Sequence, residues 1–181
     1  SAVGEFLLIA RSFKARKILC VATSALRDAP NASEFISRIR QEHSLNIKVI
    51  DGPREAYLGG MACATLLPPM EAISVDVGGG SSEFAHISKG KVIQMFSLNI
   101  GTVRLKELFM DQGDVEGASR YIDKALDALP FESIQTLIGV GGTFRALTRA
   151  LMKKEDYPLK KLHGYTTTKE IFNAFGDAVM D

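Results

Sequence analysis

The strongest indication of the fold lies in the stretch Asp76-Val77-Gly78-Gly79-Gly80-Ser81-Ser82-Glu83, where three glycines separate two apolar runs. Glycine has no Cβ, so consecutive glycines let the backbone reverse tightly and direct several N–H groups at one point. Backbone N–H groups arranged in this way bind phosphate without the bulk of side chains. We therefore expect an anion-binding loop between two strands. A plain glycine hairpin with exposed acidic residues is the alternative, and it would not need three glycines.

Two carboxylates flank this loop. Asp76 stands at the end of the strand before the glycines, and Glu83 lies in the strand after them. Carboxylate oxygens beside a phosphate suit Mg²⁺, which is usually held partly through water. The stretch therefore predicts a magnesium site next to the phosphate site.

The residues around and after the loop alternate between strand and helix patterns. Strands are expected over Ala72 to Val77, Ser82 to Ser88 and Lys91 to Leu98, with Lys89-Gly90 as a hairpin turn. Apolar periodicity then predicts helices over Thr102 to Met110, Glu116 to Leu129, Thr143 to Lys153 and Thr168 to Met180, and a strand over Gln135 to Gly139. A hairpin within alternating strands and helices is typical of an α/β unit with a mixed sheet.

The residues before the loop have the same α/β character. The patterns predict an amphipathic helix over Val3 to Phe13, strands over Lys17 to Ala22 and Asn46 to Ile50, and a helix over Arg54 to Leu67. Another helix is expected to begin at Asn31, because Asn31 and Glu34 have the spacing of a capping box.

A double proline divides the chain. Pro68-Pro69 blocks helix continuation and stiffens the connection to the next strand. We therefore expect a first lobe at residues 1–67, a hinge at 68–71 and a second lobe at 72–181.

The composition is that of a folded protein without a bulk charge preference. Of its 181 residues, 46% are hydrophobic and 24% charged, and the formal net charge is +1. Such a chain can fold without disulfides and exerts no overall attraction on nucleic acid or membranes. Cys20 and Cys63 lie in apolar runs, which predicts buried reduced thiols. With no run of about 18 apolar residues and no signal-peptide pattern, we expect a cytoplasmic protein.

Other enzyme motifs are incomplete or missing from the sequence. The segment Gly139-Val140-Gly141-Gly142-Thr143-Phe144 follows a strand, but Phe144 stands where a dinucleotide fingerprint needs its third glycine. The sequence has no Gly-x-x-x-x-Gly-Lys-Ser/Thr loop and no Gly-x-Ser-x-Gly elbow. His43, His86 and His163 show no metal-ligand spacing. The triple-glycine loop therefore remains the leading candidate site.

Five segments in order carry a family resemblance that covers essentially the whole chain. Besides the glycine loop, they are Val21-Ala22-Thr23-Ser24-Ala25-Leu26-Arg27-Asp28-Ala29-Pro30-Asn31, Ile50-Asp51-Gly52-Pro53-Arg54-Glu55-Ala56, Ser97-Leu98-Asn99-Ile100-Gly101-Thr102-Val103-Arg104 and Gly139-Val140-Gly141-Gly142-Thr143. Together they resemble the exopolyphosphatase/guanosine pentaphosphate phosphohydrolase family, within the actin, sugar-kinase and heat-shock-ATPase superfamily. The resemblance implies two actin-like (ribonuclease H-like) α/β lobes with the ligand between them.

The resemblance also implies which residues act on the substrate. Glu55 takes the position of the catalytic carboxylate that orients and deprotonates water, with an ordinary acid at a helix start as the alternative. Arg27 would bind phosphate oxygens in bidentate geometry, unless it is a surface arginine at a strand end. Asp76 and Glu83 would hold Mg²⁺.

The remaining matches concern binding. The phosphoryl group would bind at the positions Gly78, Gly79, Gly80 and Ser81, with Thr23 and Ser24 near the boundary between the lobes. Four further matches stand at positions that contact either the ligand or the other lobe: Arg104, Gly141, Gly142 and Thr143.

The sequence departs from the family pattern in two places. Arg54 and Asp51 stand where the family has glutamate and serine, so the charge around Glu55 differs. Nothing before Val21 resembles the family's opening Asp-x-Gly-Ser-Asn-Ser phosphate loop. We therefore expect a chain that is truncated at its amino terminus, short of a complete second lobe and impaired when tested alone.

The expected activity is hydrolysis of a terminal phosphoanhydride, in inorganic polyphosphate or guanosine pentaphosphate, by Mg²⁺-assisted attack of water. Two alternatives stay open: an ATP-dependent phosphotransferase of the same superfamily, and a sensor that binds polyphosphate or nucleotide without turnover. We expect a homodimer that binds neither nucleic acid nor membranes.

Overall fold

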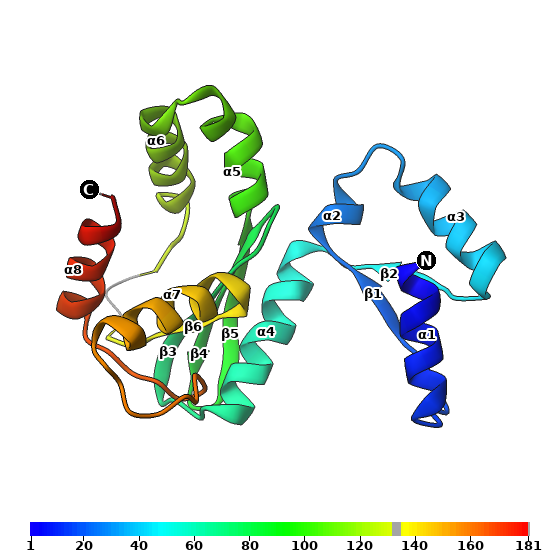
Figure 1. Cartoon of the computed structure of the whole chain (residues 1–181), viewed down its shortest axis with the longest axis horizontal. Coiled ribbons are helices and arrows are strands. Elements are labelled where there is room, and N and C mark those ends of the chain that lie inside the picture. Colours follow the sequence, from blue (N-terminus) through cyan, green and yellow to red (C-terminus); the bar gives the residue numbers. More distant parts are fainter. Residues whose placement is uncertain (132–134, 181) are drawn as a thin grey trace.

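The computed structural model describes residues 1–131 and 135–180. In chain order, its elements are α1 (Ala2–Ser12), β1 (Cys20–Ala22), α2 (Ser24–Arg27), α3 (Ala32–His43), β2 (Ile47–Val49), α4 (Gly52–Leu66), β3 (Glu71–Val77), β4 (Ser82–Ser88), β5 (Lys91–Leu98), α5 (Thr102–Leu108), the 3₁₀ turn η1 (Met110–Gln112), α6 (Val115–Leu126), β6 (Leu137–Val140), α7 (Gly141–Lys154) and α8 (Lys169–Met180). Figure 1 shows two groups of elements, each built around one sheet.

The smaller sheet consists of β1 and β2, which pair in parallel with Cys20 opposite Ile47. Its helices α1 and α3 meet in a small core in which Leu7 and Ile39 are buried beside Leu45. The strand expected from Lys17 begins only at Cys20. The expected capping box at the start of α3 is wrong: Asn31 is the N-cap residue, but its side chain makes no capping hydrogen bond.

The larger sheet is mixed, as the sequence predicts. Its strand order is β5-β4-β3-β6, with β3, β4 and β5 antiparallel and β6 parallel to β3. Lys89 and Gly90 form the tight turn between β4 and β5, and both have positive φ, 49° and 73°. Two successive residues of positive φ give the twist that such a short hairpin requires.

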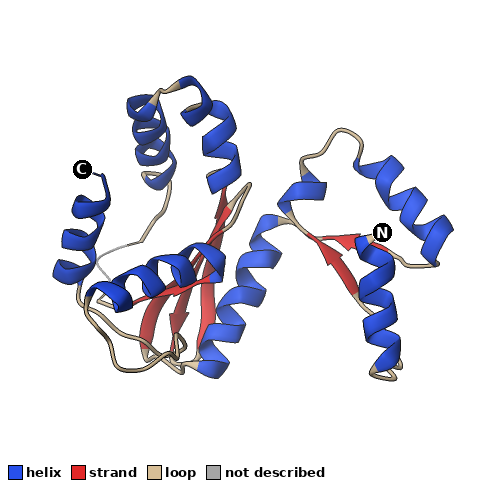
Figure 2. Ribbon diagram, in the orientation of Figure 1, coloured by secondary structure: helices blue, strands red, loops and turns tan. Residues whose placement is uncertain are grey.

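Helix α4 packs on one face of this sheet, against β4 and β5 (Figure 2). Ile87 is fully buried there and contacts the buried residues Cys63 and Ala64 of α4. A Cβ at Gly60 would lie only 2.6 Å from the Cβ of Ala85, so glycine at this position permits the close approach. Cys63 is buried as expected, whereas Cys20 is only half-buried, and both are free.

The opposite face carries aromatic side chains and helix α7. Phe131 packs against Phe84 and Phe96, with ring centroids 6.5 Å and 5.4 Å apart. Phe144 of α7 lies directly over Gly139 of β6, where a Cβ would overlap its ring. The sheet is therefore covered on both faces, by α4 and α7, as in a three-layer α/β unit.

The packing of α4 bears on the expected lobes. This helix precedes the double proline, yet it packs on the sheet that follows the double proline. The connection between the two sheets therefore lies ahead of Gly52, and residues 68–71 join α4 to a strand of the same layered unit. The division into lobes at 68–71 stays a prediction.

Apolar side chains remain exposed on the smaller sheet and on α1. Val21 of β1 is 50% exposed and Leu19, just before this strand, 76%, while Phe6 of α1 and its C-cap residue Phe13 are exposed as well. Of the five residues whose helical spacing predicts the apolar face of this helix, namely Val3, Phe6, Leu7, Ala10 and Phe13, only Leu7 is buried. None of the helices described is long and apolar enough to cross a membrane.

Candidate active site

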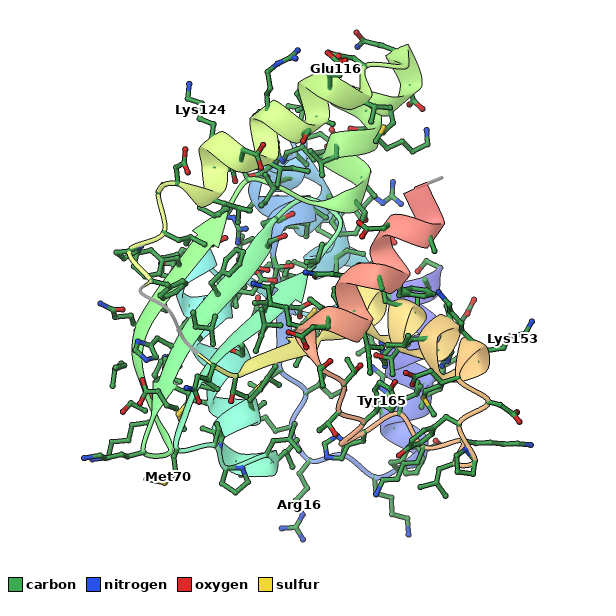
Figure 3. All side chains as sticks on the ribbon, turned by 90° about the vertical axis from the view of Figure 1, so that its left-hand side faces the viewer. Arg16, Met70, Glu116, Lys124, Lys153 and Tyr165 are labelled. Carbon is green, nitrogen blue, oxygen red and sulfur yellow. The ribbon has the colours of Figure 1, made fainter. Side chains whose placement is uncertain are left out.

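The glycine loop lies at the carboxyl end of β3, where the chain reverses into β4. The N–H of Gly78 donates to the carbonyl of Ser81 at 3.0 Å, which closes the loop. In Figure 3, Met70 marks the start of β3 at the lower end of the sheet, and Glu116 and Lys124 mark α6 beyond the upper end. The loop therefore lies at the end of the sheet that faces α5 and α6.

The amino terminus of α5 is anchored on this loop. The N–H of Thr102 donates to the carbonyl of Gly78 at 3.0 Å, and the N–H groups of Val103 and Arg104 donate to that of Gly79 at 2.9 Å and 3.0 Å. A Cβ at Gly101 would lie 2.5 Å from the Gly79 oxygen, so glycine is required for this approach. The loop carbonyls thus satisfy the first N–H groups of α5, which has no side-chain cap.

The N–H groups of the loop are left available. Those of Gly79, Gly80 and Ser81 donate to no residue in the part of the chain that the structure describes. Adjacent free N–H groups in a glycine loop form an anion-binding concavity. The predicted phosphate loop therefore has donors to offer a phosphate.

Arg27 connects three segments of the chain at this point. It ends α2, and its Nη1 donates to the carbonyl of Ile50 at 3.0 Å and to Glu55 Oε2 at 3.3 Å. Its Nη2 donates to Ser81 Oγ at 3.4 Å. Both charged side chains are about a quarter exposed, 22% for Arg27 and 26% for Glu55, so an incoming ligand can reach them.

The start of α4 fixes the position of Glu55. Asp51 is the N-cap residue and accepts a hydrogen bond from the N–H of Arg54 at 2.8 Å, and Pro53 lies in the first turn. Gly52 is buried against Ser97, whose Cβ a side chain at residue 52 would overlap. Glu55 therefore projects from a helix end that is capped and packed against the larger sheet.

Asp76 and Glu83 form a carboxylate pair in the larger sheet. They lie directly opposite each other in the β3–β4 register, so their side chains share one face. Burial raises the pKa of both carboxyls. Hydrogen bonds from Ser81 and Ser97 lower the pKa of Glu83 in part, and the charge of Arg145 does the same for the pKa of Asp76. Ser97 Oγ donates to Glu83 Oε1 at 2.8 Å.

This pair is the predicted metal site. Among the described residues there is no group of three or more histidine, cysteine or acidic side chains placed to hold a metal ion. Mg²⁺ is commonly bound by one or two carboxylates together with waters and substrate phosphates. Two neighbouring carboxylates beside a phosphate loop fit that donor set.

Arg104 and Ser24 bring α2 against the glycine loop. Arg104 Nε donates to the carbonyl of Gly80 at 2.7 Å, and its Nη2 forms an ion pair with Asp28 at 2.5 Å. Ser24 is buried, and a Cβ at Gly80 would overlap its hydroxyl. Arg104 thus contacts the loop and α2 rather than standing free.

The segment 141–143 lies beside Asp76. Gly141 has a φ of +81°, and a Cβ there would overlap the Asp76 carboxylate. Thr143 Oγ1 donates to the carbonyl of Val77 at 2.7 Å, while Gly142 has open space around it. Thr23 is half-buried as the N-cap residue of α2 and makes no side-chain capping bond.

The residues named from the sequence therefore converge on one end of the larger sheet. Three contributors were not predicted as site residues: Ser97, Asp28 and Arg145. Asp28 follows Arg27 directly, and this adjacency was the feature of the sequence that could have identified Asp28 as a site residue. Two hollows, of about 490 Å³ between α1 and the end of α3 and about 280 Å³ beside the start of α8, lie away from these residues.

Comparison with known proteins yields close relatives. The Ppx/GppA phosphatase family matches residues 1–181. A crystal structure of the Aquifex aeolicus family member is 31% identical, with a TM-score of 0.75, over 96% of this chain and 58% of that one. An exopolyphosphatase from Cytophaga hutchinsonii is 25% identical, with a TM-score of 0.78, over 98% of this chain and 61% of that one.

A curated relative extends the same picture. The bifunctional 3-dehydroquinate synthase/phosphatase of Fusobacterium nucleatum is 31% identical over 174 residues, which cover 88% of this chain and 26% of that protein. The chain thus spans about 60% of the solved structures that it resembles and about a quarter of this relative. The solved structures confirm the expected actin-like α/β fold. By the match over its whole length, this chain belongs to the Ppx/GppA phosphatase family.

Proposed function

We propose that this chain carries the hydrolytic centre of a phosphatase that releases the terminal phosphate of inorganic polyphosphate. One observation carries the proposal: the Arg27 guanidinium contacts both Ser81 of the phosphate loop and the carboxylate of Glu55. A phosphate on the loop would therefore lie within reach of a cation and a candidate base. Family membership and the similarity to an exopolyphosphatase support this substrate class.

The roles follow from the positions of the groups. The free N–H groups of the loop would hold the phosphoryl oxygens, and Arg27 would neutralise charge that develops on them. Glu55 would orient the attacking water and accept its proton. Phosphoryl transfer requires mainly such positioning and charge neutralisation, so no covalent intermediate is needed.

Mg²⁺ is part of this proposal. Asp76 and Glu83 would hold the ion, since they are neighbouring carboxylates and burial is the main cause of their raised pKa values. A bound Mg²⁺ would supply charge neutralisation to the leaving phosphate oxygens. The serine hydroxyls at Ser81 and Ser97 would keep the carboxylate of Glu83 oriented.

A substrate panel tests the proposal. Phosphate release from polyphosphate and from guanosine pentaphosphate is measured in the full natural protein, with Mg²⁺ and with EDTA. We expect Mg²⁺-dependent release from polyphosphate, and release from guanosine pentaphosphate would widen the substrate class to a second terminal phosphoanhydride. Formation of ADP from ATP with an acceptor would instead show a phosphotransferase. Tight binding of polyphosphate without any release would show a sensor, and either result would overturn the proposal.

A further inference from the structure

Three successive carbonyls of the glycine loop are held on the side of α5. Backbone N–H groups of α5 hold the carbonyls of Gly78 and Gly79, at 2.9 Å to 3.0 Å. The carbonyl of Gly80 has no such backbone partner among the described residues, and the side chain of Arg104 holds it instead, from Nε at 2.7 Å. The backbone of α5 thus binds the first two carbonyls of the loop, and the side chain of Arg104 binds the third.

The orientation of each carbonyl fixes the direction of an N–H group. A trans peptide is planar, with its C=O and N–H on opposite sides. The carbonyls of Gly78, Gly79 and Gly80 share peptides with the N–H groups of Gly79, Gly80 and Ser81 in turn. When α5 and Arg104 hold the three carbonyls, the three N–H groups point away from α5 and stay free to meet a ligand.

Asp28 holds the guanidinium of Arg104 in place. The ion pair between Arg104 Nη2 and Asp28 engages the outer edge of the guanidinium while Nε holds Gly80. Asp28 follows Arg27 in the chain and is the C-cap residue of α2. The side chain of Arg104 thus contacts both the Gly80–Ser81 peptide and the end of α2 that carries Arg27.

We propose that Arg104 is a positioning residue, which orients the Gly80–Ser81 peptide toward the substrate phosphate and links the loop to α2. We assign it to positioning rather than to substrate binding, because its Nε holds the Gly80 carbonyl and its Nη2 pairs with the Asp28 carboxylate. This inference rests on the proposed function for its effect on turnover. Its structural part, the held peptide, is independent of any activity.

The structural part is tested in the ligand-free protein by NMR. We expect Arg104→Gln to change the carbonyl-carbon shift of Gly80 and the amide shift of Ser81, while Arg104→Lys changes them less. Arg120→Gln is the matched control, since Arg120 lies exposed on α6. Unchanged Gly80 and Ser81 shifts in both Arg104 variants would overturn the proposal, whatever the activity of the protein.

The functional part is tested by steady-state kinetics with polyphosphate. Losing one preorganised donor lowers kcat by roughly 10²-fold or more, so a misdirected Ser81 N–H should lower kcat by about 10-fold to 10²-fold. We expect Arg104→Gln to do this, Arg104→Lys to restore part of it and Asp28→Asn to lose less than Arg104→Gln. A raised KM with unchanged kcat would identify Arg104 as a uniform substrate ligand and overturn the proposal. If the wild type releases no phosphate from polyphosphate, the proposed function fails, while the NMR result still stands or falls separately.

Discussion

Asp76 and Glu83 face each other across the β3–β4 register, and burial raises the pKa of both carboxyls. Burying two acids opposite each other in a sheet destabilises the fold when both are charged, mainly through lost hydration, and the charge of Asp76 adds repulsion at Glu83. Protons or a bound cation at this end of the sheet would reduce that destabilisation. The buried pair should therefore make the free energy of unfolding depend on pH.

We expect Asp76→Asn to stabilise the metal-free protein while removing Mg²⁺-dependent turnover. Between the ordinary values of 3.8 and 4.5 and the raised values in the fold, the native state binds more protons than the unfolded state. The free energy of unfolding therefore falls as pH rises through this window. The substitution should flatten that slope and raise the free energy of unfolding by about 0.5 kcal/mol at pH values above this window.

Thermal unfolding in EDTA across the pH range measures both effects. Asp123→Asn, an exposed acid on α6, is the control, and an equal slope in wild type and Asp76→Asn would contradict the prediction.

We expect Glu55→Gln to keep affinity for polyphosphate and to lower kcat by about 10²-fold or more, because glutamine keeps the size of the side chain but cannot accept the proton. Steady-state phosphate release and equilibrium binding measure the two quantities. Glu34→Gln is the matched control, since Glu34 is also an acid in the first turn of a helix. If both variants retain turnover, Glu55 is only an acid at a helix start.

Gly80→Ala should remove phosphate binding at the loop. Its Cβ would overlap the buried hydroxyl of Ser24, so either the loop or α2 must move. Gly79→Val should weaken binding as well, because its Cβ would press on Val103 at 3.3 Å and its branched side chain would narrow the loop. Calorimetric titration with tripolyphosphate measures the loss. Gly59→Ala on α4, with open space around it, should bind normally, and normal binding by Gly80→Ala would refute the assignment of the loop.

Ile87→Ala should lower the free energy of unfolding by about 3 kcal/mol, because it empties a fully buried position between the larger sheet and α4. Ile93→Ala on the neighbouring strand removes the same atoms from a side chain that is 52% exposed, and should lower the free energy of unfolding much less. Urea unfolding of both variants provides the comparison. Similar decreases in the free energy of unfolding would mean that α4 does not pack on Ile87.

We expect the 181-residue chain to self-associate through β1. Among the described residues this strand pairs with β2 alone, and two apolar residues in or beside it, Leu19 and Val21, are 76% and 50% exposed. An open, apolar strand edge is a template for pairing between molecules. Sedimentation velocity should show a concentration-dependent assembly that Val21→Lys reduces. Val115→Lys replaces a valine of the same 50% exposure on α6 and should leave the assembly unchanged.

Local patterns were sufficient to predict most of the elements and the loop. The strands β4 and β5 begin and end at the predicted residues, because each is bounded by a glycine turn and has a clear apolar pattern. The short helix α2 was not predicted, since four residues carry no periodicity. That Asp76, Glu83, Arg27 and Glu55 come together follows from a family resemblance, not from spacing in the sequence.

The side chains that contact the site residues could not be predicted from local sequence patterns. Counting back from the turn at Lys89 and Gly90 places Phe96 opposite Glu83, but a bulge between His86 and Ile87 shifts the register by one residue. Ser97 therefore reaches Glu83, and no local rule predicts that bulge. The docking of α4 on the larger sheet and the contact of Arg104 with Asp28 depend equally on tertiary packing.

The hydrogen bonds and ion pairs from the side chains of Arg27 and Arg104 join α2 to the loop and to α4, whereas α4 is held on the sheet by apolar contact. Neutral salt screens the first kind of contact, with a Debye length of about 8 Å at 0.15 M and about 3 Å at 1 M. Sulfate strengthens the second kind by favouring apolar burial. An ammonium sulfate step during purification therefore weakens the polar contacts that hold α2 and strengthens the apolar packing of α4 on the sheet. A buffer of low ionic strength has the opposite effect on both.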